Sequence, residues 1–142
     1  MRRPAAPPEG RAVRPHRQRR TVNADSVNAD SSDLASRRCK PCEGGVPPLE
    51  RTAARQLLAS LQGDWELAED GRHISRRFAF RDFYRTMSFV NAIAHLANIE
   101  DHHPDLEVGY NYCRVRYTTH AVKGLSENDF ICAARIDRIP TI

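Results

Sequence analysis

At residues 100–104 the chain reads Glu100–Asp101–His102–His103–Pro104, and this stretch decides where its longest helix stops. Pro104 disfavours helical geometry in the residue before it, so a helix that arrives from the N-terminal side cannot run past His103. The two histidines therefore lie where a helix ends and where side chains are free to face a ligand. Because the unperturbed pKa of histidine lies near neutral pH, this stretch is a candidate for chemistry that moves protons.

Two further motifs supply polar side chains of related kinds. Thr118–Thr119–His120 closes a run of alternating residues, and Gly124–Leu125–Ser126 is followed by Asp129. Ser126 is placed to cap a helix, and a carboxylate three residues later can satisfy backbone amides of the first turn. From the pattern alone, Asp129 is therefore placed to complete a helix cap, whatever the function of the protein.

Hydrophobic periodicity predicts three helices and a hairpin. Apolar residues recur at helical spacing over 49–61, over 82–97 and after Ser126. Alternation predicts strands over 65–68 and 73–80, and the Asp-Gly pair between them is a strong hairpin signal. These elements predict an α+β domain.

The residues between 106 and 120 alternate in hydrophobicity, but the phase changes near Cys113. This pattern fits either two strands or one strand with a bulge. The order of elements is then helix, strand, strand, helix, one or two strands, and helix. That order is typical of helices packed on one face of a small antiparallel sheet.

The helix expected over 82–97 has a broad apolar surface, and Asp82 can cap its start. Its apolar residues form two adjoining stripes: Phe83, Met87, Val90, Ala94 and Ala97, and beside them Phe89, Ile93 and Leu96. A helix of this kind is either buried on several sides or in contact with another subunit.

Composition divides the chain into a tail, residues 1–36, and a domain, residues 37–142. Residues 1–20 contain seven arginines and one acid, a balance of +6, so residues 21–142 carry −2 of the total of +4. Residues 1–33 lack the apolar surface needed to offset the entropy of ordering, and we expect disorder there. A slightly acidic domain argues against nucleic-acid binding. No apolar run suits a membrane span or a secretory signal, which favours a soluble, cytoplasmic protein.

Cys39–Lys40–Pro41–Cys42 is a single CxxC motif with three interpretations. It is half of a zinc site, without a second half in the sequence. It is also the spacing of a redox pair, although no βαβ pattern surrounds it. The third interpretation, a loop that leads to the first helix, is favoured, and without an export signal the cysteines are expected to be reduced.

Taken together, these motifs resemble the pterin-4a-carbinolamine dehydratase family. The matching residues lie between about Pro47 and Ile139: Trp65, Phe78, Phe83, Asp101–His102–His103–Pro104, Tyr110–Asn111, Thr118–Thr119–His120, Gly124–Leu125–Ser126 and Asp129. The resemblance implies three helices on a four-stranded antiparallel sheet, in the order α-β-β-α-β-β-α. It also implies homodimers or homotetramers, and no metal or organic cofactor.

The activity that the resemblance implies is loss of water from a 4a-hydroxytetrahydropterin to give quinonoid dihydropterin. This reaction recycles the cofactor of aromatic amino acid hydroxylases. The leaving hydroxyl needs a proton and the N5 hydrogen needs an acceptor, and histidines on opposite sides of a flat ring can divide these roles. The resemblance assigns acid/base work to His102, His103 and His120, with His103 as the essential one; which is acid and which is base stays open.

The resemblance also implies a set of substrate-binding residues: Asp101, Pro104, Thr118, Thr119, Ala121, Asp129, Trp65 and Asn98. Within this set the resemblance gives Asp129 the role of orienting a histidine or a bound ring nitrogen, which competes with its interpretation as part of a helix cap. Trp65 has the competing interpretation of a core residue. Asn98 stands where many members of the family have a glutamate. Because its amide cannot accept a proton, this difference bears on the rate of dehydration more than on the assignment to the family.

Two other functions compete with the enzyme. Two adjacent histidines with a third histidine and an aspartate suit zinc, although the family works without metal. A non-catalytic dimerisation, assembly or transcriptional coactivator module with a vestigial pterin pocket would use the broad apolar surface of helix 82–97. Retention of all three histidines favours the enzyme.

Overall fold

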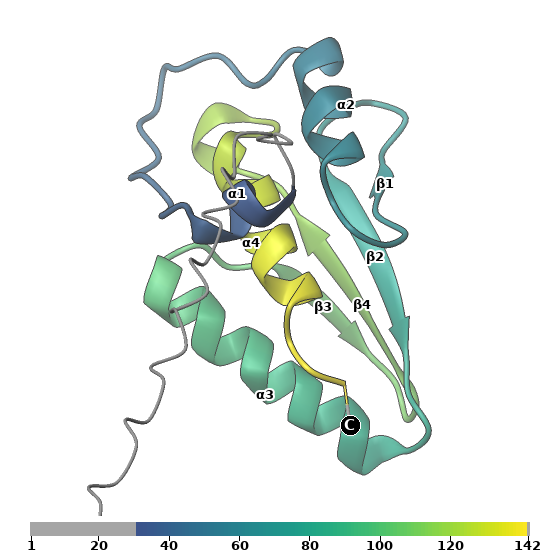
Figure 1. Ribbon diagram of the computed structural model, residues 1–142. Helices are drawn as coiled ribbons and strands as arrows, with labels where there is room; N and C mark the ends of the chain where they lie inside the picture. The colour runs from purple at the N-terminus through teal and green to yellow at the C-terminus, as the bar shows by residue number, and fades with distance from the viewer. Residues whose placement is uncertain (1–30, 142) are drawn as a thin grey trace, which may run out of the picture.

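The computed structural model describes residues 31–141, which form an antiparallel sheet with helices on one face (Figure 1). Its elements in chain order are α1 (Ser31–Ser36), α2 (Arg51–Ala59), β1 (Glu66–Leu67), β2 (Ile74–Ala79), α3 (Phe83–Glu100), β3 (Asp105–Val108), β4 (Tyr112–Tyr117), the 3-10 turn η1 (His120–Val122) and α4 (Glu127–Asp137). The four strands lie in the order β1-β2-β4-β3, and every neighbouring pair is antiparallel. The predicted α+β fold is confirmed.

The alternating segment after residue 104 forms two strands. β3 and β4 pair so that Val108 lies opposite Cys113, and the amide of Gly109 donates to the carbonyl of Tyr112 at 3.0 Å. The phase change near Cys113 is therefore the effect of a hairpin turn, which resets the alternation. Of the two alternatives that the pattern allowed, the hairpin is correct.

Helix α3 begins as the sequence predicts and ends three residues later than expected. The Asp82 carboxylate accepts a hydrogen bond from the amide of Arg85 at 2.9 Å, which caps the start. The helix ends at Glu100, and Asp101 takes a left-handed conformation with φ of 49°. The amide of His102 then donates to the carbonyl of Ala97 at 3.2 Å. This C-terminal cap turns the chain so that His102 and His103 leave the helix before the proline.

The two apolar stripes of α3 differ in burial. Phe89 and Ile93 of one stripe are buried, whereas the other stripe runs from Phe83, which is 51% exposed, to Ala97, which is buried. Tyr84, next to Phe83, is 73% exposed. The start of α3 thus presents aromatic surface to solvent.

The packed part of the chain begins before residue 37. Helix α1 packs against α4, with Leu34 3% exposed in the main hydrophobic core. Residues 31–36 therefore differ from the disordered tail expected for 1–36, because Leu34 and Ala35 bury apolar surface. The average composition of residues 1–36 is polar and does not reveal these two apolar positions. Residues 1–30 of that expected tail lie outside the described residues. Across residues 31–141, no helix has the length and apolar character to cross a membrane.

Candidate active site

A buried imidazole–carboxylate pair forms the centre of the candidate site. His102 is 8% exposed, and its Nε2 lies 2.7 Å from Oδ1 of Asp129, which has no exposed surface. The imidazole stacks on the ring of Tyr117 from β4, with ring centroids 5.6 Å apart and planes 6° from parallel. Three elements thus fix this ring: the C-terminal cap of α3, the first turn of α4 and the central sheet.

The second oxygen of Asp129 serves the helix cap. Its Oδ2 accepts from the hydroxyl of Thr119 at 2.8 Å and from the amide of Ser126 at 2.9 Å, and the Thr119 and Ser126 hydroxyls lie 2.7 Å apart. The two interpretations of Asp129 are therefore compatible, because one carboxylate oxygen faces His102 while the other completes the capping box of α4.

Burial of His102 acts to lower its pKa, since burial disfavours the charged imidazolium. The hydrogen bond to Asp129 and the charge of that carboxylate act in the opposite direction and prevail, so the pKa of His102 is raised. The contacts with Asp129 and Tyr117 hold this imidazole in one orientation.

The other two predicted catalytic histidines are exposed, and each is next in sequence to a member of this buried network. His103 follows His102, and its Nε2 lies 3.1 Å from the amide oxygen of Asn98. His120 follows Thr119 and opens η1 with its side chain exposed. The structure therefore has one buried, fixed imidazole, that of His102. The two exposed imidazoles belong to residues that follow His102 and Thr119 in the chain.

Four of the predicted substrate-binding residues lie close to the histidines in the sequence. Thr118 donates its hydroxyl to the carbonyl of Arg72 at 2.6 Å. Asp101 and Ala121 are exposed, and Pro104 is half-buried. These three lie beside the histidines in the chain: Asp101 is the C-terminal cap of α3, Pro104 comes just before β3, and Ala121 is in η1.

Trp65 does not lie with the histidine cluster. It is 6% exposed, packs edge-to-face with Phe78 and donates its indole N–H to Asp137 at 2.9 Å. Asp137 ends α4 and Asp129 is in its first turn, so about 12 Å of helix separates them. The burial of its large ring and the internal partner of its one donor agree with the interpretation of Trp65 as a core residue. Arg76, 2.7 Å from Asp137, shares that partner.

Sequence reasoning missed Glu100, whose side chain is 2% exposed. It lies 2.6 Å from the guanidinium of Arg135 and 3.2 Å from that of Arg38, and it accepts from the amide of Cys39 at 2.9 Å. Burial acts to raise its pKa, but the amide and the two guanidinium groups outweigh burial, and the pKa is lowered. A glutamate that precedes a helix-ending motif gives no sequence signal for partners this distant.

The lowered pKa of Glu100 predicts a pH dependence of stability. The ionised form is favoured by folding, so its contribution is present above the ordinary value of 4.5 and is lost as pH falls through the folded pKa. We expect the difference in free energy of unfolding between wild type and Glu100→Gln, from urea denaturation, to be constant near pH 7 and to shrink below pH 4.5. Glu66→Gln, at an exposed strand position, is the control. A difference that grows on acidification would contradict this assignment.

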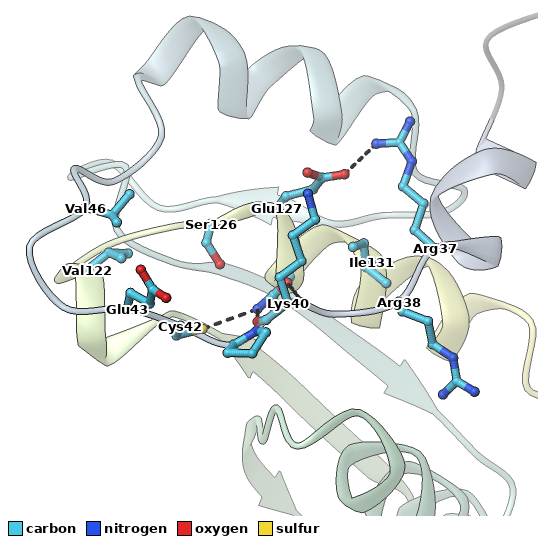
Figure 2. Close-up of a pocket in the computed structure, with 12 residues that line it drawn as sticks. Arg37, Arg38, Lys40, Cys42, Glu43, Val46, Val122, Ser126, Glu127 and Ile131 are labelled. Atoms are coloured by element: carbon cyan, nitrogen blue, oxygen red, sulfur yellow. Dashed lines mark hydrogen bonds and ion pairs between the residues drawn. The ribbon is translucent and has the colours of Figure 1, made fainter.

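A cavity of about 630 Å³ opens beside the histidine network (Figure 2). Its lining comes from within residues 37–46, from Val122 of η1, and from within residues 126–131 of α4 and its cap. Figure 2 shows Arg37 and Glu127 joined across one end, at 2.5 Å. The cavity meets the network at Ser126, while the three histidines are not among its lining residues.

The cysteines of the CxxC motif face different partners. Cys39 Sγ lies 3.5 Å from Sγ of Cys132, whereas Cys42 Sγ lies 3.2 Å from the side-chain amide of Asn128. The motif lies in a loop, as the favoured interpretation predicts. Among residues 31–141, no three His, Cys, Asp or Glu side chains converge as they would around a metal ion.

These surroundings predict the order in which the thiols react. The contact with Cys132 raises the pKa of Cys39, and burial adds to the effect, so this thiol stays protonated near neutral pH. Burial raises the pKa of Cys113 to about 11. Because the thiolate is the nucleophile, we expect iodoacetamide at pH 8 to alkylate exposed Cys42 first, as read by peptide mass spectrometry. Faster alkylation of Cys39 in the folded protein would contradict this contact.

Comparisons with known proteins agree with these features. The family model described as "Pterin 4 alpha carbinolamine dehydratase" matches residues 47–139. A protein of Nitrosomonas eutropha named "Putative pterin-4-alpha-carbinolamine dehydratase" is 61% identical over 107 residues, which cover 75% of this chain and 93% of the relative. A protein of the same name from Legionella pneumophila is 58% identical over 109 residues, which cover 77% and 96%.

A solved structure has the same arrangement of elements. The crystal structure of a "transcriptional coactivator/pterin dehydratase" from Brucella melitensis superposes with a TM-score of 0.60 at 30% identity, and covers 63% of this chain and 95% of that one. Fold and site define a small α+β protein with a buried histidine–aspartate pair and two exposed histidines next in sequence to members of its network. The chain belongs to the pterin-4α-carbinolamine dehydratase family, which confirms the resemblance drawn from its motifs.

Proposed function

We propose that this protein dehydrates a 4a-hydroxytetrahydropterin to quinonoid dihydropterin by histidine acid/base catalysis. In this reaction the bond from C4a to the hydroxyl breaks, the hydroxyl leaves as water after gaining a proton, and N5 loses its hydrogen. Both proton transfers must work near neutral pH, where imidazole is the most effective side chain. Membership of the family supports the class of reaction, and the arrangement of the histidines supports the proposed mechanism.

The observation that carries the proposal is the difference in environment among the histidines: one is buried and fixed, and two are exposed. His102 is locked to Asp129, and Asp129 is locked to Thr119. The exposed His103 and His120 each adjoin one of these fixed residues and are free to meet substrate. An exposed imidazole next to a fixed residue can meet a bound ring in a defined position, which favours proton transfer. His103 and His120 divide the transfers at N5 and at the leaving hydroxyl, and Asn98 holds His103 rather than exchanging a proton.

The wider role follows from the reaction. An enzyme of this kind acts after a pterin-dependent aromatic amino acid hydroxylase and returns its cofactor for reduction. We place it in the cytoplasm, as a homodimer or homotetramer, with no cofactor of its own. The exposed aromatic surface at the start of α3 supports self-association, because Phe83 stacks on Tyr110, which is 67% exposed.

Accumulation of the 4a-hydroxy intermediate during hydroxylase turnover tests this role. Without a dehydratase the intermediate builds up and decays at its uncatalysed rate. We expect the purified protein, added in catalytic amount, to abolish the build-up seen by ultraviolet absorbance. Unchanged accumulation over a range of protein concentrations would contradict the proposal.

A second candidate function is a non-catalytic dimerisation or coactivator module. It is favoured by the same exposed aromatic side chains, Phe83, Tyr84 and Tyr110, and by the likeness to the Brucella protein, which is described both as a transcriptional coactivator and as a pterin dehydratase. Under either function Phe83→Ser should alter molar mass in multi-angle light scattering, so it is the dehydration rate that separates the two. If the protein were only a module, there would be no dehydration rate for any histidine substitution to change.

A further inference from the structure

Residues 37–42 form an extended strap that crosses from α1 to the loop before α2 and lies against α3 and α4 (Figure 1). The strap precedes residues 47–139, which the family model matches. It contains no helix or strand, and most of its residues are exposed. Cys39 packs against Cys132 of the core, and two buried polar side chains hold the strap backbone through hydrogen bonds.

The first of these side chains is Asn128, which is 6% exposed. Its amide oxygen accepts from the amide of Lys40 at 3.0 Å, and its amide nitrogen donates to the carbonyl of the same residue at 2.6 Å. One side chain thus satisfies both backbone groups of a strap residue, as a neighbouring strand would. Asn128 immediately precedes Asp129 in the first turn of α4.

The second side chain is Glu100, which accepts from the amide of Cys39 and from Arg38 of the strap. The same carboxylate lies against Arg135, whose guanidinium also donates to the carbonyl of Arg37 at 2.5 Å. Glu100 is the last residue of α3 and lies two positions before His102. The strap therefore contacts the two chain segments that carry His102 and Asp129.

We propose that the strap positions the His102–Asp129 pair, with Asn128 and Glu100 as the positioning residues. His102 leaves α3 through a left-handed cap, and Asp129 stands on the first turn of a separate helix. The strap joins these two segments on the side of Glu100 and Asn128, which limits their relative movement. The catalytic consequence rests on the proposed dehydratase function, whereas the structural coupling does not.

The test is Asn128→Ala in the full chain, with three readouts. Amide hydrogen exchange at Lys40 reports release of the strap. An NMR titration reports the imidazole of His102, which is faced by Asp129 of α4, Asp101 of the α3 cap, Cys39 of the strap and the ring of Tyr117. The dehydration rate reports catalysis.

We expect exchange at Lys40 to rise, the pKa of His102 to fall toward that of a free imidazole, and the rate to fall about 10-fold. Lys40→Ala is the matched control, because it changes the strap side chain and keeps both backbone hydrogen bonds to Asn128; exchange and titration should stay as in wild type. Asn128→Ser, which is polar but too short to reach both groups, replaces the alanine variant if that one fails to fold.

The outcomes separate this proposal from the enzymatic one. If exchange at Lys40 rises while the titration of His102 is unchanged, the strap does not position the pair and the proposal is overturned. Unchanged exchange at Lys40 also overturns it, because Asn128 then does not hold the strap. An inactive wild type would contradict the dehydratase function alone, since exchange and titration still decide the coupling.

Discussion

Replacing His103 by alanine is expected to lower the rate constant for dehydration by about 100-fold or more, the range typical of a lost general acid or base. His103 is exposed just after the end of α3, and its side chain forms a hydrogen bond with Asn98. Its loss removes an imidazole that can reach substrate while the buried pair of His102 and Asp129 stays in place. Stopped-flow absorbance of the 4a-hydroxytetrahydropterin measures the rate constant, and circular dichroism checks the fold.

His95→Ala is the matched control for this variant. His95 is an exposed histidine on the same helix, two turns before the site, so it reports the general effect of removing an imidazole from α3. We expect wild-type rates from it. Full activity in His103→Ala would show that proton transfer does not pass through this residue, and would leave His120 as the exposed candidate.

Replacing Asp129 by alanine is expected to lower the free energy of unfolding by about 3–5 kcal/mol, the range for removal of one partner of a buried ion pair. Asp129 has no exposed surface and satisfies three groups at once: the imidazole of His102, the hydroxyl of Thr119 and the amide of Ser126. The variant leaves His102 without its buried counter-charge and the first turn of α4 without its cap. Urea denaturation followed by circular dichroism measures the change.

Glu127→Ala is the control for the helix dipole. Glu127 is a carboxylate in the same first turn of α4, but it is half-exposed and pairs with Arg37 at the surface. A surface pair of this kind contributes about 0–1 kcal/mol. If Asp129→Ala cost no more than Glu127→Ala, the network around His102 would not stabilise the fold, and a site built on it would lose its physical basis.

The parts of the structure that local chemistry determines were predictable from sequence. Pro104 sets a limit for α3, Asp82 caps its start, and Ser126 with Asp129 forms the capping box of α4. The Asp-Gly turn of the first hairpin, with Gly71 at φ of 72°, belongs to the same class. Each of these features depends on residues within a few positions of one another.

What sequence reasoning missed depends on contacts between distant residues. The hydrogen bond from the amide of Cys39 to Glu100 joins residues 61 positions apart, and no periodicity encodes it. The hydrogen bond from Trp65 to Asp137 joins residues 72 positions apart and depends on where α4 packs. The part of α1 that packs was hidden in a segment whose average composition is polar.

The most direct test of this account is the decay of preformed 4a-hydroxytetrahydropterin in single-turnover stopped flow, with the protein in excess. The proposed function predicts decay that is faster than in buffer and that rises with protein concentration to a plateau. It also predicts that the plateau rate depends on pH near neutrality, where imidazole exchanges protons. Decay equal to that in buffer at every protein concentration would contradict the central claim, and the histidine cluster would then belong to a binding module.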